Sequence, residues 1–318
     1  MRIPDVAAGA RILAFGGYQP AGIVTNDDLA KTMETNDEWI QSRVGIKERR
    51  VAGPEESLAD MATQAAAKAL AASGLSAADI DLVIVATCTG ETQIPNVSAT
   101  VAHRLGIDSP GAFDVNAACA GFCYALATAS AAVRGGAARH VLVIGAEKLS
   151  QWVDWTDRAT AVIFADGAGA AVVGPSDTPR IGPVVWGSSG DKAEVISVAD
   201  RNSFLYQEGQ TVFRWATTSL HPVAKEACER AGVDPSELAA FVPHQANLRI
   251  IEAIARKIGA DDAVIARDIV LAGNTSAASI PLAISRMIER GEVQSGGLAL
   301  LLGFGAGLTY AGQVIEIP

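Results

Sequence analysis

The sequence lacks the features that mark several other classes of protein. Its four cysteines, at positions 88, 119, 123 and 228, form no regular framework, and Cys119 with Cys123 is C-x-x-x-C rather than the C-x-x-C of metal and redox sites. No apolar run reaches membrane-spanning length, and Pro4 and Asp5 interrupt the N-terminus where a signal peptide needs a continuous apolar core. We therefore expect an unprocessed, soluble protein of the reducing cytoplasm without membrane association.

Positive charge is scarce as well. The chain has 25 Lys+Arg against 35 Asp+Glu, a net charge of -10, whereas a nucleic-acid binder usually carries a basic footprint. The glycine-rich turns do not form a phosphate loop, because GAGAAV has Val172 where G-x-G-x-x-G needs a small residue, and no G-x-x-x-x-G-K occurs. We expect no nucleic-acid partner, no metal site and no bound cofactor.

The composition favours a large globular α/β protein. With 318 residues, 49% of them hydrophobic, the chain can bury a large core as one unit or as two coupled domains. Alanine-rich helical segments alternate with short β-branched runs, which is typical of buried strands in an α/β fold. In the first half we predict helices at 57–74, 98–106 and about 120–135, strands at 80–87, 111–115 and 139–147, and two strands joined by a glycine-rich turn within 160–174.

The second half repeats the order of the first. We predict helices at 221–232, 248–259 and 274–291 and strands at 238–244, 297–307 and 309–317. Glycines that end a helix or a strand recur 158 residues apart, as Gly74 and Gly232 and as Gly145 and Gly303, and Cys119 and Asn274 precede alanine-rich helices 155 residues apart. We predict two copies of one α/β unit, residues 1–175 and 176–318, with strand ends that meet at a shared ligand site.

Cys119 stands at the start of a predicted helix. It is flanked by small residues, namely Ala117, Ala118, Ala120 and Gly121, so other backbone and a ligand could approach the sulfur. A helix that begins near Ala120 would point N–H groups at the sulfur, which favours the thiolate. A small buried hydrophobic residue is the alternative, and this stretch alone leaves both interpretations open.

Three further segments carry polar or bare backbone groups at predicted strand ends. The strand at 238–244 ends at His244, the junction before another helix contains Asn274, and residues 303–307 form a glycine-rich loop with accessible N–H groups. A thiol, a histidine, an amide and free N–H donors together suit acyl-thioester chemistry, which needs a nucleophile and stabilisers for oxyanions.

Four motifs now resemble one family. DVNAACAGF, VPHQANLRI, GNTSAAS and FGAGLTYA occur in the order found in β-ketoacyl-acyl-carrier-protein synthase III, a thiolase-fold condensing enzyme, and the similarity spans nearly the whole chain. The resemblance implies a thiolase fold with two similar α/β halves stacked as five layers (αβαβα), and a homodimer. Two departures are Ala306, where many relatives have glycine, and the segment 190–208, which is individual and leaves the acyl-chain preference open.

The resemblance also implies a reaction. An acyl-CoA starter would be joined to malonyl-acyl carrier protein in the step that initiates fatty acid synthesis, releasing CoA and CO2 and giving a 3-oxoacyl carrier protein. Cys119 corresponds to the nucleophile that takes the acyl group, and His244 with Asn274 to the pair that hydrogen-bonds the malonyl thioester oxygen. The backbone N–H groups of Cys119 and Ala306 correspond to the oxyanion hole, where one donor is typically worth roughly 10²- to 10³-fold in rate.

Other positions match binding residues of the family. The positions implied to contact CoA are Trp39, which would stack on adenine, Arg43, Arg158 and Asn247. The positions implied to bind the acidic carrier protein are Arg249, Arg256 and Lys257, a basic stripe in an acidic chain. Ile94 matches the residue that lines the acyl pocket from the partner subunit. A core tryptophan, solvated basic side chains and an ordinary packing isoleucine are the alternatives.

Three other functions were weighed. A papain-like cysteine hydrolase also has Cys, His and Asn in this order, but its C-G-[SA]-C-[WY] signature is absent and it does not account for the repeat. A catalytically dead condensing-enzyme partner normally lacks the nucleophile. A synthase III relative that primes polyketide assembly, or passes its acyl group to an oxygen or nitrogen acceptor, stays open. Structural or packing roles are expected for the remaining His and Cys side chains: His103, His140, His221, Cys88, Cys123 and Cys228.

Overall fold

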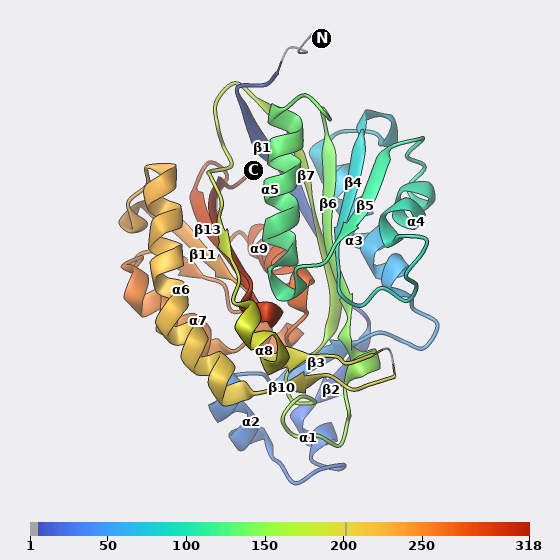
Figure 1. Cartoon of the computed structure of the whole chain (residues 1–318), viewed down its shortest axis with the longest axis vertical. Helices are drawn as coiled ribbons and strands as arrows, with labels where there is room; N and C mark the ends of the chain where they lie inside the picture. The colour runs from blue at the N-terminus through green and yellow to red at the C-terminus, as the bar shows by residue number, and fades with distance from the viewer. Residues whose placement is uncertain (1–5, 201) are drawn as a thin grey trace.

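The computed structural model describes residues 6–200 and 202–318, and two five-stranded sheets form its centre (Figure 1). The first sheet has the order β1–β7–β6–β4–β5, with β1 Gly9–Tyr18, β7 Asp166–Ser176, β6 Val141–Lys148, β4 Leu82–Ala86 and β5 Gly111–Val115. The second has the order β12–β11–β13–β14–β8, with β12 Val264–Ile265, β11 Leu238–Pro243, β13 Leu298–Phe304, β14 Tyr310–Glu316 and β8 Val185–Gly187.

The two sheets have one topology. Taken from β8 to β12, the second sheet follows the order of the first from β1 to β5. In each, the middle strand, β6 or β13, pairs in parallel with β4 or β11 and antiparallel with β7 or β14. The predicted repeat of an α/β unit is therefore present in the strand pairing.

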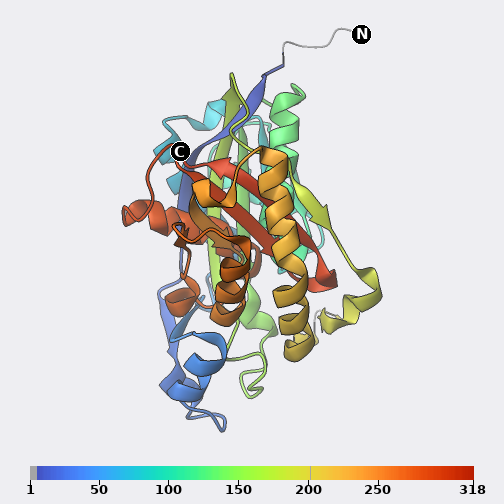
Figure 2. The same ribbon diagram turned by 90° about the vertical axis from the view of Figure 1, so that its left-hand side faces the viewer.

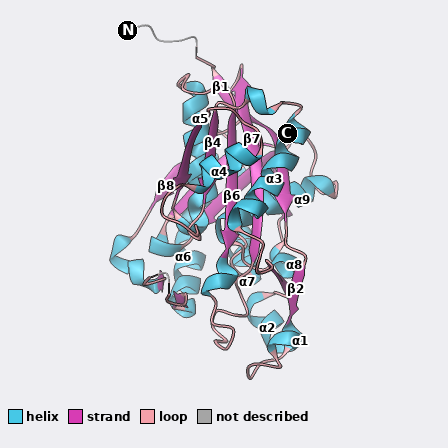
Figure 3. Ribbon diagram, turned by 90° about the vertical axis from the view of Figure 1, so that its right-hand side faces the viewer, coloured by secondary structure: helices cyan, strands magenta, loops and turns pink. Residues whose placement is uncertain are grey.

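Helices lie between the sheets and on both outer faces. α3 (Leu58–Ser73) and α4 (Val97–Arg104) cover the first sheet, and α6 (Gly209–Ala231) and α7 (Leu248–Ile258) cover the second (Figures 2 and 3). α5 (Gly121–Arg134) and α9 (Ser279–Glu289) lie in the middle layer. The core around them joins both helices to both sheets through side chains such as Phe122, Ile284, Val143 and Leu301. The predicted five-layer thiolase fold is confirmed.

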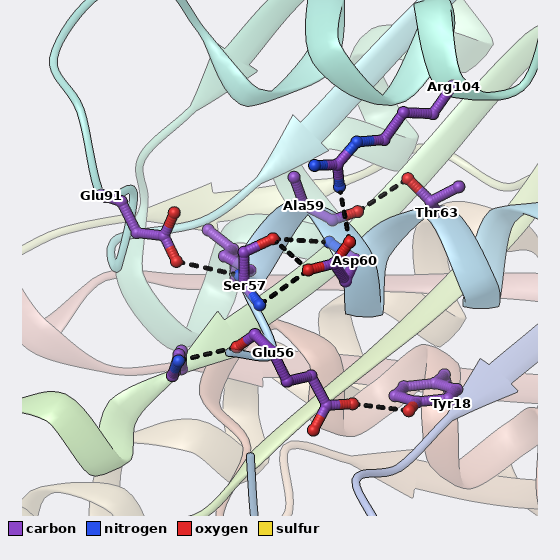
Figure 4. Close-up of polar contacts among 10 residues, drawn as sticks. Tyr18, Glu56, Ser57, Ala59, Asp60, Thr63, Glu91 and Arg104 are labelled. Carbon is purple, nitrogen blue, oxygen red and sulfur yellow. Dashed lines mark hydrogen bonds and ion pairs between the residues drawn. The ribbon is translucent and has the colours of Figure 1, made fainter. Parts of the chain in front are cut away.

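The ends of α3 illustrate how local sequence sets an element. Ser57 and Asp60 form a capping box at its N-terminus, and Gly74 ends it in the left-handed conformation at φ 74° (Figure 4). Arg104 of α4 donates to Asp60 over 3.0 Å, and Glu91 accepts from the N–H of Leu58 over 3.2 Å. The first turn of α3 is thus connected both to α4 and to the loop that carries residues 88–96.

Short elements gather at the lower end of Figure 1. They are β2 Gly22–Thr25, α1 Asn26–Leu29, α2 Asp37–Val44, β3 Glu48–Val51, β9 Ile196–Ser197, β10 Tyr206–Gln207 and α8 Ile269–Ala272. They pack around a separate apolar cluster that includes Ile40, Phe164 and Ile251. Short 3-10 helices occupy Ala77–Asp79 (η1), Ala118–Ala120 (η2), Leu149–Trp152 (η3), Gly190–Val195 (η4), Pro235–Glu237 (η5), Ser276–Ala278 (η6) and Ala306–Leu308 (η7).

Two sequence-based boundaries are wrong. Residues 160–174 do not form two strands, because 160–163 are turns and only β7 follows. The apolar residues 162–164 are buried as the wall of a cavity, and an apolar run of that length looks like a strand. α6 begins at Gly209, not near His221. Within residues 6–200 and 202–318, no helix combines the length and apolarity needed to cross a bilayer.

Candidate active site

Cys119 lies in η2, directly before the first turn of α5. The backbone of Gly305 packs against it so closely that a Cβ at Gly305 would lie 2.7 Å from the Cβ of Cys119 and 3.0 Å from its sulfur. A Cβ at Gly303 would lie 3.0 Å from the Cα of Ala120. The expectation that small residues allow backbone to approach this cysteine is confirmed, and the glycine-rich loop after β13 is the backbone that approaches.

Removal from water opposes the thiolate that the helix N-terminus favours. Burial raises the pKa of the Cys119 thiol to about 12, and the carboxylate of Glu147 also raises it. The Ser276 hydroxyl and the N–H groups of Cys119 and Ala306 lower the pKa, but they do not compensate. A helix N-terminus stabilises a charge by at most about 2 kcal/mol, or roughly 1.5 pKa units, so removal from water dominates.

His244 follows β11 and is almost completely buried. Its Nδ1 lies 2.7 Å from the Oγ of Ser279, and its ring meets Phe304 edge to face at 5.2 Å. The Ser279 oxygen accepts from the N–H of Gln245 over 3.3 Å, so its own hydrogen is available for Nδ1. Burial lowers the pKa of the imidazole to about 3, so the ring is neutral, and this pairing favours the tautomer that carries its hydrogen on Nε2.

Asn274 is fixed by its neighbours on both sides. Its Oδ1 accepts from the N–H of Ser276 over 2.9 Å. Its backbone N–H donates to the carbonyl of Ile163 and its carbonyl accepts from the N–H of Ala165, each over 2.9 Å. Because Oδ1 is occupied, the side chain presents its NH₂ group to a ligand, so both His244 and Asn274 are arranged as hydrogen-bond donors.

One cavity of about 880 Å³ brings most of the predicted site residues together. They come from five separate segments of the chain, and they are Trp39, Arg43, Cys119, Arg158, His244, Asn247, Arg249 and Asn274. The guanidinium groups of Arg158 and Arg43 lie 4.6 and 5.8 Å from the ring centre of Trp39. Asn247 caps α7 and donates to the carbonyl of Arg43 over 3.1 Å. The cavity thus runs from a cationic aromatic end to a cysteine.

Four predicted residues lie outside this cavity, namely Ala306, Arg256, Lys257 and Ile94. Arg256 and Lys257 are exposed on the last turn of α7, where the Nζ of Lys257 donates to the carbonyl of Thr217 over 2.6 Å. Ile94 is 86% exposed and lines neither of the two cavities that contain Cys119. Arg214 of α6 was missed, although it lines the same cavity as Arg249, because the sequence pattern placed the start of α6 too late.

A second cavity, of about 660 Å³, lies on the other side of Cys119. Its lining includes Cys88, Asn116, Ala306 and parts of the segment 196–205. Cys88, expected to be a packing residue, is therefore a cavity residue, and its thiol donates to the Oε1 of Glu147 over 3.3 Å. The segment that was individual in sequence is thus part of the wall beside the cysteine.

Glu147, at the end of β6, is a buried acid that no sequence motif indicated. It accepts hydrogen bonds from the backbone N–H groups of Cys88 and Thr89. It also accepts from hydroxyl groups, including that of Ser276 in η6. Burial raises the pKa of this carboxyl. It ties the loop after β4 to η6. Across the described ranges 6–200 and 202–318, no group of three or more His, Cys, Asp or Glu is placed to hold a metal ion.

Comparison with known families gives two matches. Residues 113–190 match the family model described as 3-Oxoacyl-[acyl-carrier-protein (ACP)] synthase III. Residues 228–317 match the model described as 3-Oxoacyl-[acyl-carrier-protein (ACP)] synthase III C terminal. The two matches contain the positions of Cys119, His244 and Asn274.

Individual proteins are similar over almost the whole chain. The chain is 57% identical over 313 residues to Beta-ketoacyl-[acyl-carrier-protein] synthase III 4 of Streptomyces coelicolor, covering 98% of this chain and 99% of the relative. The solved priming β-ketosynthase from the R1128 polyketide biosynthetic pathway has a TM-score of 0.97 at 44% identity, covering 100% and 98%. The 3-oxoacyl-[acyl-carrier-protein] synthase III from Aquifex aeolicus VF5 has a TM-score of 0.92 at 42% identity, covering 97% and 100%.

Proposed function

Because this chain belongs to the 3-oxoacyl-[acyl-carrier-protein] synthase III family and is an acyltransferase of the condensing type, we propose that it joins an acyl-CoA starter to malonyl-acyl carrier protein. The products are CoA, CO2 and a 3-oxoacyl carrier protein. The observation that carries the proposal is the single cavity that holds the thiol of Cys119 together with His244 and Asn274.

Cys119 performs the first half-reaction. Its sulfur attacks the thioester carbon of acyl-CoA, the bond from that carbon to the CoA sulfur breaks, and the proton of the Cys119 thiol passes to the departing CoA sulfur. The N–H groups of Cys119 and Ala306 both lower the pKa of the Cys119 thiol, which supports a position from which they reach an oxygen on a carbon bonded to the sulfur. They serve as the oxyanion hole, and Ala306 can replace glycine there because only its backbone is used.

His244 and Asn274 serve the second half-reaction. Both present N–H donors, as their other polar atoms are occupied by Ser279 and by the N–H of Ser276. The donors hold the malonyl thioester oxygen while CO2 leaves, and they stabilise the charge that develops on that oxygen. The resulting enolate carbon attacks the acyl group, and the sulfur of Cys119 is released.

The cationic end of the cavity can bind CoA, and the exposed face of α7 near it can bind a carrier protein. Trp39 with the guanidinium of Arg158 offers an aromatic face for adenine and positive charge for phosphates. Arg249 and Arg256 are seven residues apart, hence on one face of α7, and they provide a basic surface for an acidic partner.

Further proposals concern the domains, location and assembly of the protein. The chain comprises two halves, residues 1–175 and 176–318, and it works in the cytoplasm as a homodimer. The exposure of Ile94 supports a position at the acyl pocket of the partner subunit. A second candidate function is the priming of polyketide assembly, which the similarity to the R1128 priming β-ketosynthase favours.

The test offers a panel of acyl-CoAs and malonyl-acyl carrier protein, with products identified by mass spectrometry. Cys119 should gain one acyl mass, and a label on Cys88, Cys123 or Cys228 instead would refute its role. His244→Ala and Asn274→Ala should still acquire the acyl group but should not condense it. A variant of His244 that cannot be acylated would make this histidine the base for the thiol, as in a cysteine hydrolase.

A further inference from the structure

Arg49, on β3, is a buried cation whose hydrogen bonds go to neutral oxygens. Its side chain is completely inaccessible to solvent, and in residues 6–200 and 202–318 no carboxylate forms an ion pair with it. Burial lowers the pKa of its guanidinium to about 10. Buried charges are usually paired because burying an unpaired charge costs free energy. Exceptions to this rule are commonly found at functional sites.

The guanidinium binds neutral oxygens from two separate parts of the chain. Nη1 donates to the Oδ1 of Asn26 over 2.7 Å and to the carbonyl of Val24 over 3.3 Å. Nη2 donates to the carbonyl of Val162 over 2.8 Å. Arg49 therefore fastens residues 162–164, in the wall of the cavity that contains Cys119, to the antiparallel strand pair β2–β3.

The same wall holds Asn274 in place. Ile163, next to the carbonyl that Arg49 binds, accepts from the N–H of Asn274, and Ala165 donates to its carbonyl. Gly273 has a left-handed φ of 74°, and a Cβ there would lie 2.7 Å from the Cβ of Ala165 and 2.9 Å from the Cβ of Arg49. Arg49 thus packs against Gly273, the residue before Asn274. Its hydrogen bond to Val162 also holds the segment that pairs with the backbone of Asn274.

A second branch of the contacts leads to the cationic end of the cavity. The Nδ2 of Asn26 donates to the Oδ1 of Asp37 and to the carbonyl of Ile46, each over 2.8 Å. Asp37 is the first residue of α2, the helix that carries Trp39 and Arg43. The hydrogen-bond chain from Arg49 therefore reaches both ends of the cavity, although Arg49 lines neither of the two cavities at Cys119.

We propose that Arg49 is a positioning residue for condensation, because its buried guanidinium sets the place of Asn274 relative to Cys119 through the wall at Val162–Ala165. This inference rests on the proposed role of Asn274 in the malonyl half-reaction. Cys119 itself lies on η2 next to Gly305 and α5, whereas the hydrogen bonds of Arg49 go to Val24, Asn26 and Val162. Loss of Arg49 should therefore impair the two half-reactions unequally.

The experiment compares both half-reactions in Arg49→Lys and Arg49→Met. A lysine keeps the charge but cannot span both sets of oxygens at once, and methionine keeps only the apolar stem. A displacement of about 1 Å can cost 10²-fold, so decarboxylation of malonyl-acyl carrier protein should fall roughly 10- to 100-fold in Arg49→Lys. At saturating acyl-CoA, acylation of Cys119 should stay close to the wild-type rate, whereas KM for acyl-CoA should rise because Asn26 and Asp37 connect Arg49 to α2. Arg50→Lys is the matched control, since Arg50 is the next residue of β3 and is paired with Glu48 instead.

A double-mutant cycle identifies the route. If Arg49 acts through Asn274, Arg49→Lys should cost much less in an Asn274→Ala background than in the wild type. Three results would overturn the inference, provided that Asn274→Ala itself is impaired. They are normal decarboxylation in Arg49→Lys, equal losses in both half-reactions, and fully additive effects of the two substitutions. Normal decarboxylation in Asn274→Ala would overturn the proposed function itself. Arg49→Lys carries the decision if Arg49→Met does not fold.

Discussion

Replacing Gly305 with alanine should disable Cys119 without removing any group that ionises or donates a hydrogen bond. Gly305 is at the end of β13 with an extended backbone, φ −178°, so an alanine there is not strained by its own conformation. Its N–H donates to the carbonyl of Thr309 over 3.0 Å, and alanine keeps that donor. The effect of the substitution is therefore confined to one added methyl group.

The magnitude follows from the space at Cys119. The new Cβ would lie 2.7 Å from the Cβ of Cys119, 2.9 Å from its N and 3.0 Å from its sulfur, whereas ordinary contacts begin at 3.4 Å. Relief of the shortest contact needs a shift of about 0.7 Å, and a misplacement of about 1 Å can cost 10²-fold, so acylation should slow on the order of 10- to 100-fold. Overpacking of this kind also costs about 1–3 kcal/mol of stability.

The assay follows the acyl adduct on the intact protein by mass spectrometry after mixing with acyl-CoA, and calorimetry reports Tm. Gly53→Ala is the matched control, because nothing lies within 4 Å of a Cβ at that position. The control should acylate at the wild-type rate. An equally fast Gly305→Ala enzyme would refute the idea that the loop after β13 fixes the nucleophile.

Three further predictions concern the remaining parts of the site. Ser279→Ala removes one hydrogen bond to His244 and should slow decarboxylation about tenfold while acylation continues, whereas Ser279→Thr should retain the rate. Arg256→Glu should raise KM for the carrier protein at low salt and leave acyl-CoA turnover intact. Arg249→Glu should affect both, because Arg249 lines the cavity and Arg256 does not. A KM for the carrier protein that is unchanged in Arg256→Glu would contradict this. Alkylation of Cys119 requires loss of the thiol proton, and burial raises the pKa of this thiol to about 12. The alkylation rate of the free enzyme should therefore rise steadily from neutral pH to about pH 9. A rate that levels off below about pH 8 would contradict this raised pKa.

Most of the fold could be predicted because the two halves repeat a strong pattern. Buried strands such as β4 and β6 are β-branched runs, and glycines such as Gly74 and Gly232 end helices in the left-handed conformation that favours this residue. The failures lie where tertiary packing decides. The turns at 160–163 are apolar because they wall a cavity, and the first turns of α6 are rich in threonine and aromatic residues, which are weak helix formers.

The site could be predicted only in part for a related reason. Cys119, His244 and Asn274 stand at strand or helix ends, where an α/β topology brings ligand-binding groups together, so their order in the chain was informative. Their supports were not visible, because the contacts join distant positions. Ser279 is 35 residues from His244, and Arg49 is 113 residues from Val162.

The two halves keep one turn before the inner helix and use it for different chemistry. The Oδ1 of Asn116 accepts from the N–H of Ala118 over 3.2 Å, and the Oδ1 of Asn274 accepts from the N–H of Ser276 over 2.9 Å. Ala118 and Ser276, 158 residues apart, both have a left-handed φ, 45° and 48°, which is unfavourable for residues with a side chain.

Strain that persists at both copies of a turn indicates that the turn geometry itself is required. In the first copy the residue after the strained position is Cys119, and in the second it is Ala277, whose carbonyl is so close to β6 that a Cβ at Gly145 would lie 2.2 Å from its oxygen. Alanine has no nucleophilic group, so the second copy contributes no nucleophile at that place, and its Asn274 lines the cavity instead. In the proposed reaction, a duplicated turn thereby supplies the nucleophile from one half and a hydrogen-bond donor from the other.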